Sequence, residues 1–147
     1  MSVPTSMVRT PTGRPGIGHR VEVRIVGALL ALAVGYVHIK DQGGLPGEKD
    51  PGYIGLTYYV VESAAVVAML ALLLAGARRR AAAWLLVLGV GVGPVVGFVL
   101  SRGPGLPNYS DDKGNWTEQL GIISLVLEGL LIVVALAALS RLRRPTS

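Results

Sequence analysis

The sequence predicts an all-α integral membrane protein in which four transmembrane helices form an antiparallel bundle. Three observations lead to this prediction. Hydrophobic residues make up 51% of the 147 residues and charged residues only 16%, whereas charged residues make up about 25% of an ordinary soluble domain. The mean hydropathy is +0.55. Four separate stretches are each long and apolar enough to cross roughly 30 Å of hydrocarbon.

The four predicted spans lie within residues 21–140, which we take as one transmembrane domain. The first span is the weakest, because Glu22 and Arg24 shorten its uninterrupted apolar run to residues 25–39. Its flanking polar side chains must therefore extend toward the interface. The predicted spans cover residues 21–39, 53–77, 81–101 and 119–139.

The segments outside this domain are short and basic. Residues 1–20 contain three prolines and three glycines, which predicts a disordered tail, and residues 141–147 form a second basic tail. A basic segment before an apolar stretch is also typical of a signal peptide. We favour a retained first span, because the basic segment is long and no small-residue cleavage site follows the apolar run.

The distribution of arginine predicts the orientation in the membrane. Arginines concentrate before the first span, between the second and third spans, and after the fourth, whereas the two longer connections mix basic with acidic residues. Basic residues concentrate on the cytoplasmic side. The sequence therefore predicts cytoplasmic termini, and its richness in Ala, Gly, Val, Leu and Arg suggests the inner (plasma) membrane of a bacterium. The groups are Arg9, Arg14, Arg20 and Arg24; Arg78, Arg79 and Arg80; and Arg141, Arg143 and Arg144.

Composition also excludes several classes of function. The net charge of +5 is a topology signal and a contact with anionic lipid headgroups; without interleaved aromatic residues it does not indicate nucleic acid. The chain has no cysteine, which excludes disulfides, thiol catalysis and iron–sulfur clusters. His38 is the only histidine near the membrane, so haem held by two histidines is excluded. We expect no cofactor, no metal site and no catalytic residues.

The third span contains a stripe of small residues in "LGVGVGPVVGF". Gly89, Gly93 and Gly97 recur at four-residue spacing, which places them on one face of a helix. Such a face allows two membrane helices to approach closely. The sequence leaves two uses open, namely packing within the bundle and homodimerisation.

Two glutamates lie inside the predicted spans. Glu62 and Glu128 each follow the apolar start of a span by eight residues, which places both about 12 Å below the outer boundary at 1.5 Å per residue. A charged residue that faces lipid costs about 2.5–3.5 kcal/mol on insertion scales. We therefore expect both to point inward and to approach each other across the bundle axis. Tyr58 and Ser124 precede them by one turn and supply a hydroxyl on each face.

These glutamates have several interpretations. We expect at least one of them to be protonated at neutral pH. The pair can be a proton-handling site, a cation site or a hydrogen-bonded tie between helices. In the functional interpretation, Glu62 and Glu128 form the floor of an outward-facing pocket, and His38 and Arg102 form its rim. In the simpler interpretation, His38 is a boundary residue bonded to a loop.

The motifs "GYVHIKDQGG" and "GFVLSRGPGLPNYSDDKGNWTEQLGIISLVLEGLLIVV" carry a resemblance to a family. The chain resembles small four-span membrane proteins that are common in actinobacteria. These proteins are similar in a histidine near the end of the first span, a Ser–Arg–x–x–Gly–Leu–Pro segment after the third, and a Trp–x–Glu…Ser–Leu–x–x–Glu entry into the fourth. The resemblance supports the fold and the choice of residues and implies no activity. The matching positions are His38, Ser101 to Pro107, Trp116, Glu118, Ser124 and Glu128.

The sequence favours a non-enzymatic role as an accessory or interaction subunit of a larger membrane assembly. Its partners would be the lipid bilayer and either another membrane protein or further copies of the chain. The alternative is a small bundle that handles a ligand, a proton or a cation through the carboxylate pair. A membrane enzyme ranks third, because no nucleophile–base set occurs at a recognisable spacing.

Overall fold

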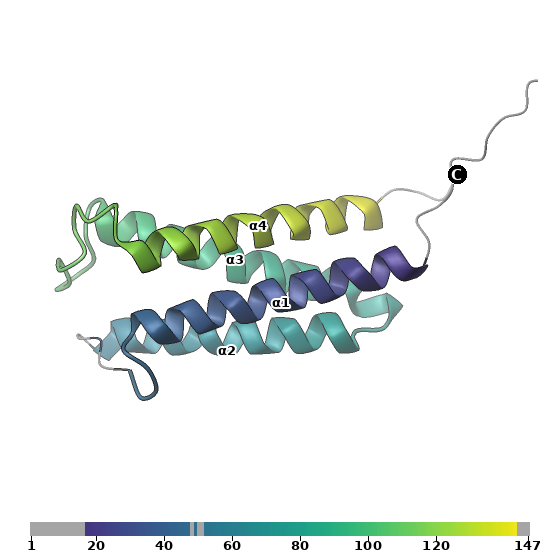
Figure 1. Ribbon diagram of the computed structural model, residues 1–147, viewed down its shortest axis with the longest axis horizontal. Helices are drawn as coiled ribbons and strands as arrows, with labels where there is room; N and C mark the ends of the chain where they lie inside the picture. Colours follow the sequence, from purple (N-terminus) through teal and green to yellow (C-terminus); the bar gives the residue numbers. More distant parts are fainter. Residues whose placement is uncertain (1–16, 48, 50–51, 144–147) are drawn as a thin grey trace, which may run out of the picture.

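The protein is an antiparallel bundle of four long helices (Figure 1). The computed structural model describes residues 17–47, 49 and 52–143. Its described part has no β-strand beyond an isolated bridge between Leu106 and Tyr109. The predicted all-α fold is therefore confirmed. The elements are α1 (Ile17–Asp41), α2 (Gly52–Leu74), the 3-10 helix η1 (Ala77–Arg79), α3 (Arg80–Arg102) and α4 (Gln119–Leu142).

All four helices are long and apolar enough to cross a membrane, as expected of a multi-pass membrane protein. Their bounds agree with the predicted spans to within a few residues, with two differences. Helix α1 begins at Ile17, so residues 17–20 are helical although we expected them in the disordered tail. Helix α2 ends at Leu74 because η1 forms the connection to α3. The rest of the predicted tails, residues 1–16 and 144–147, lies outside the described residues.

The bundle has two ends, which we call the terminal end and the loop end. At the terminal end, α1 begins, η1 connects α2 to α3, and α4 ends. At the loop end lie residues 42–47, which follow α1, and residues 103–118, which connect α3 to α4 (Figure 1). Helices α1 and α3 each pack against both α2 and α4, and they also touch each other across the bundle. Helices α2 and α4 are therefore kept apart.

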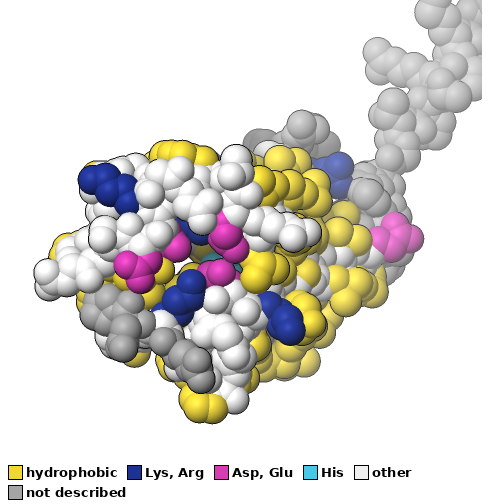
Figure 2. Space-filling model, turned by 60° about the vertical axis from the view of Figure 1, so that its left-hand side comes forward, with side chains coloured by type: hydrophobic (Ala, Val, Ile, Leu, Met, Phe, Trp, Pro, Cys, Tyr) yellow, Lys and Arg dark blue, Asp and Glu magenta, His cyan; other side chains and the backbone are white. Residues whose placement is uncertain are grey.

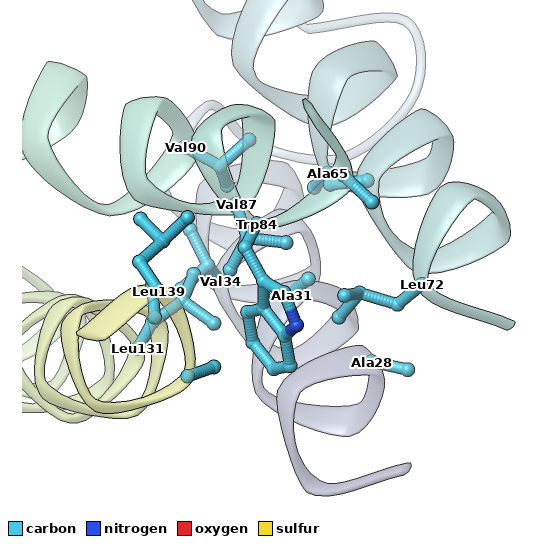
Figure 3. Packing of buried hydrophobic residues seen from close by; sticks show 14 residues of the cluster. Ala28, Ala31, Val34, Ala65, Leu72, Trp84, Val87, Val90, Leu131 and Leu139 are labelled. Atoms are coloured by element: carbon cyan, nitrogen blue, oxygen red, sulfur yellow. The ribbon is translucent and has the colours of Figure 1, made fainter. Parts of the chain in front are cut away.

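The core consists mainly of small and branched side chains, and it lies toward the terminal end. Ala31, Ala65 and Ala135 are fully buried, and the large Trp84 side chain fills the space between the helices (Figure 3). Large apolar side chains instead cover the outside; Leu74, for example, is 79% exposed. Small residues inside and large ones outside suit helices that associate in lipid, where close backbone approach holds a bundle together.

The Arg24 guanidinium explains how the first span accommodates a charge. Its Nε donates a hydrogen bond to the Leu72 carbonyl (2.6 Å), and its Nη2 donates to the carbonyls of Leu73 (3.1 Å) and Ala75 (3.2 Å). These carbonyls belong to the last turn of α2 and its exit, where helix carbonyls lack partners and carry partial negative charge. Arg24 thus caps a neighbouring helix instead of facing lipid.

The predicted glycine face of α3 does not pack against another helix. A Cβ atom added to Gly89, Gly93 or Gly97 would meet no atom within 4 Å. The close approach occurs instead at Gly91, where an added Cβ would lie 2.8 Å from Ile132 Cγ1 and 3.2 Å from the Glu128 carbonyl oxygen. No helix therefore packs closely against the face at Gly89, Gly93 and Gly97, and Gly93 and Gly97 instead border a space between the helices.

Gly91 and Gly89 form a matched pair for testing this packing. We expect Gly91→Ala to lower the free energy of unfolding by about 1 kcal/mol, because an overpacked contact costs about 1–3 kcal/mol and exceeds the gain in helix propensity. Gly89→Ala should leave stability unchanged or raise it. Thermal unfolding in one detergent, followed by tryptophan fluorescence, measures both. Equal effects of the two substitutions would contradict the assigned α3–α4 contact.

Candidate functional site

A cavity of about 300 Å³ opens between the four helices at the loop end. Figure 2 shows a hollow at the centre of this end, with acidic and basic side chains around it and a histidine inside. We call it the loop-end cavity. Its polar lining comprises His38, Asp41, Tyr53, Thr57, Tyr58, Ser101, Arg102, Tyr109, Asp112, Ser124 and Glu128.

The cavity exists because small residues replace core side chains in the half of the bundle near the loop end. Gly93, Gly97 and Gly121 all line it, and Pro94 lies beside them on α3. The well-packed core ends about one turn away, at Val34 on α1 and Val90 on α3. The bundle is thus divided into a filled apolar half and a hollow half with a polar lining.

Glu128 lies on the α4 wall of the cavity and is almost fully buried, with 1% of its surface exposed. The Ser124 hydroxyl, one turn earlier on the same helix, donates a hydrogen bond to Glu128 Oε1. The second carboxyl oxygen, Oε2, is buried and has no hydrogen-bond partner. A buried polar atom without a partner is costly, which makes Glu128 a candidate for binding something that enters the cavity.

His38 faces Glu128 from α1. Its Nδ1 lies 2.9 Å from the Val34 carbonyl oxygen, and because a carbonyl can only accept, Nδ1 must carry the hydrogen of this bond. In a neutral ring, Nε2 then carries the lone pair. It lies 3.9 Å from Glu128 Oε1, which is too long for a direct hydrogen bond and suits a bridging group.

Asp41 and Tyr58 form a second polar contact on the α1–α2 side of the cavity. The Tyr58 hydroxyl donates to Asp41 Oδ2, and Lys49 Nζ lies 3.8 Å from the same oxygen. The Tyr58 ring also lies beside the His38 ring, with 5.6 Å between centroids. The Asp41 carboxylate is therefore paired with Tyr58 and Lys49 and not with His38 or Glu128.

Arg102 organises the opposite side, where it ties the α3–α4 connection to the bundle. Its Nη2 donates to Glu118 Oε2 (2.8 Å), and its Nη1 donates to Asp112 Oδ2 (3.3 Å) and to Ser101 Oγ (2.9 Å). Glu118 also caps α4, because the same oxygen accepts from the Gly121 amide (3.1 Å). The guanidinium lies over the Phe98 ring, 4.1 Å from its centroid.

Tyr109 extends this network in the connection between α3 and α4. Its hydroxyl donates to Asp112 Oδ2 (3.0 Å). Burial raises the pKa of the Tyr109 hydroxyl above its usual range, and the neighbouring Asp112 carboxylate adds to the increase. Tyr109 therefore remains a neutral hydrogen-bond donor at the cavity rim at any physiological pH.

Glu62 lies apart from this site. It is buried on α2, but it does not line the cavity, and the buried Gln42 side chain lies near it. The expected approach of Glu62 to Glu128 is therefore wrong. The physical reason is the contact between α1 and α3 across the bundle, which separates α2 from α4.

The structure thus brings together five of the six polar residues that we singled out from the sequence. The site proposed from the sequence lacked several polar residues of the lining, among them Asp41, Tyr109 and Asp112. Asp41 had a usable signal, because it follows His38 by three residues and so shares its helix face. Tyr109 and Asp112 lie in a connection whose path no periodicity predicts. The five are His38, Tyr58, Arg102, Ser124 and Glu128.

The described residues contain no group of three or more His, Cys, Asp or Glu side chains that could hold a metal ion. Comparison of the chain with protein-family models, curated proteins and solved structures gave no match. The resemblance to small four-span actinobacterial membrane proteins stays a prediction. The function must therefore be argued from the cavity itself.

Substitution of Arg102 tests the network on the α3–α4 side. We expect Arg102→Gln to lower the free energy of unfolding by about 2 kcal/mol, because it leaves the carboxylates of Asp112 and Glu118 without their cation in a partly buried setting. Lys113→Gln, which removes an exposed cation from the same connection, should have little effect. Thermal unfolding of both variants in the same detergent measures the difference. Indistinguishable unfolding midpoints of the two variants would contradict the role of Arg102 in holding the α3–α4 connection against the bundle.

Proposed function

We propose that this chain is a multi-pass protein of the bacterial inner membrane that binds a small ligand in the loop-end cavity. The observation that carries the proposal is the Glu128 carboxyl group, which is buried against the cavity with one oxygen unpaired. Ionisable groups inside a membrane are expensive and generally mark functional sites. The cavity volume of about 300 Å³ lies at the lower end of the range for small-molecule sites.

The role that the sequence favoured, an accessory subunit, receives less support from this geometry. The outward helix faces are mostly apolar, as contact with lipid requires. A hollow with a polar lining, in contrast, is difficult to explain in a subunit that serves only to pack against a partner. We propose a binding role without covalent chemistry, and a partner protein or a second copy on the outer faces is compatible with it.

We further propose that the loop end faces away from the cytoplasm. The terminal end carries Arg24, Arg78, Arg79, Arg80 and Arg141, whereas the loop end mixes acidic and basic residues. The positive-inside rule then places both termini in the cytoplasm. In this orientation the cavity receives its ligand from the outside of the cell.

A cavity-filling substitution tests the binding role. Gly97 lines the cavity and Gly89 does not, yet both have open space at the Cβ position on the same helix. We expect Gly97→Leu to abolish ligand binding, because the new side chain occupies the cavity, and Gly89→Leu to retain it. The probes are water-soluble small amines, alcohols and carboxylic acids, each added to the purified protein during thermal unfolding.

A ligand at ten times its Kd stabilises the folded state by about 1.4 kcal/mol, which raises the unfolding midpoint by a few degrees. At least one probe class should produce this increase, saturably, in the wild type and in Gly89→Leu. Failure of every class, or an equal increase in Gly97→Leu, would contradict the proposed function.

A further inference from the structure

We propose that the loop-end cavity exchanges one proton for one small organic cation, with the Glu128 carboxyl group as the site that the two share. This inference rests on the proposed function and specifies its ligand. It follows from the charge that the cavity carries, from the partners that its charged groups already have, and from the position of His38 opposite Glu128.

The cavity has an excess of acidic groups. Its lining contains the three carboxyl groups of Asp41, Asp112 and Glu128 against the one guanidinium of Arg102. Lys49 and Glu118, which pair with members of this set from outside the lining, offset each other. A low-dielectric cavity with this excess favours a positively charged ligand.

Among these acidic groups, only Glu128 has a buried carboxyl oxygen without a partner. Asp112 is bonded to Arg102 and Tyr109, and Asp41 to Tyr58 with Lys49 close by. Arg102 donates to three partners through Nη1 and Nη2 and lies over Phe98, and only its buried Nε has no acceptor. Glu128 alone offers a buried carboxyl oxygen without a partner to the cavity.

The lining favours an organic cation over a metal ion. Glu128 is a single carboxyl group, and the part of the chain that the structure describes contains no cluster of three metal-ligating side chains. Divalent cations take several oxygen ligands or a closed set of nitrogen and oxygen ligands. Aromatic rings and aliphatic side chains cover much of the remaining wall, as suits an alkylammonium ion. These residues are Tyr53, Tyr58, Phe98 and Tyr109, with Val37, Ile54, Val61, Leu106 and Leu120.

The proton competes with this cation because both neutralise the same group. When the O–H bond of the Glu128 carboxyl group breaks, the proton leaves to water at the loop end, directly or by way of His38 Nε2, and the carboxylate pairs with the cation. His38 is placed for this step, since its Nδ1–H is held by the Val34 carbonyl and its Nε2 faces Glu128. His38 is a positioning residue that helps to hold the proton.

The expected pH dependence has a definite sign. The cation and the proton must weaken each other's binding by the same factor. Cation affinity should therefore rise as the pH rises, by up to tenfold per pH unit while the site is protonated, and then level off. The titratable or charged groups that line the cavity with Glu128 are His38 and Asp41 of α1, Tyr53 and Tyr58 of α2, Arg102 of α3, and Tyr109 and Asp112 of the connection.

The experiment compares tetramethylammonium, whose charge is permanent, with tert-butanol, a neutral molecule of similar shape. Isothermal titration of the purified full chain in two buffers of different ionisation enthalpy counts the protons released. We expect wild type to bind tetramethylammonium with release of about one proton. Glu128→Gln should bind it at least tenfold more weakly and release none, and Glu62→Gln, a buried carboxyl group outside the cavity, should match wild type.

His38→Gln provides a second variant that retains Glu128. It should still bind tetramethylammonium, with a shifted pH profile. Tetramethylammonium binding that is equal in wild type and Glu128→Gln, or that is constant from pH 6 to pH 8, would overturn the inference. If tert-butanol binds both proteins equally well while tetramethylammonium does not bind, the cavity is a ligand site and only the cation–proton exchange fails.

Discussion

Inside the hydrocarbon of a bilayer no water is available to satisfy a polar group, so each one must find its partner within the protein or line a cavity that water can enter. Most of this bundle follows from that constraint. Arg24 donates hydrogen bonds to the last carbonyls of α2. Arg102 donates hydrogen bonds to Glu118, Asp112 and Ser101. Glu128 is satisfied only in part, because one carboxyl oxygen accepts a hydrogen bond from Ser124 and the other has no partner. Glu62, Gln42, Arg80 and Arg102 also keep buried atoms without a partner, and of these four side chains only Arg102 lines the cavity.

The division of the bundle into two halves places this unsatisfied group where a ligand can reach it. Toward the terminal end, small side chains such as Ala31 and Ala135 let the helices pack closely around Trp84. Toward the loop end, glycines of α3 leave the space open, and the charged network of Arg102 holds the connection at its rim. One half supplies the rigidity of the bundle, and the other supplies the site.

Sequence reasoning predicted the spans, and five of the six polar residues that it singled out line the cavity. Both successes rest on strong local signals, namely the length of the apolar stretches and isolated charges inside them. It failed where the outcome depends on which helices touch. Equal depth suggested that Glu62 meets Glu128, but the contact of α1 with α3 separates their helices. Likewise, regular spacing suggested that Gly89, Gly93 and Gly97 pack together, whereas the α3–α4 contact uses Gly91, which has no such repeat. The first case depends on which helices touch and the second on how α3 is rotated about its axis, and composition carries little information about either.

Cysteine accessibility tests the hollow loop-end half most directly, because the chain contains no cysteine of its own. Single substitutions Gly97→Cys, Gly89→Cys and Ala135→Cys place a thiol in the cavity, on the outer face and in the core, respectively. A thiol must ionise to react, which requires water. A charged methanethiosulfonate reagent added outside intact cells should therefore modify only Gly97→Cys. Modification of Gly97→Cys no faster than of Gly89→Cys would contradict a water-accessible cavity that opens away from the cytoplasm.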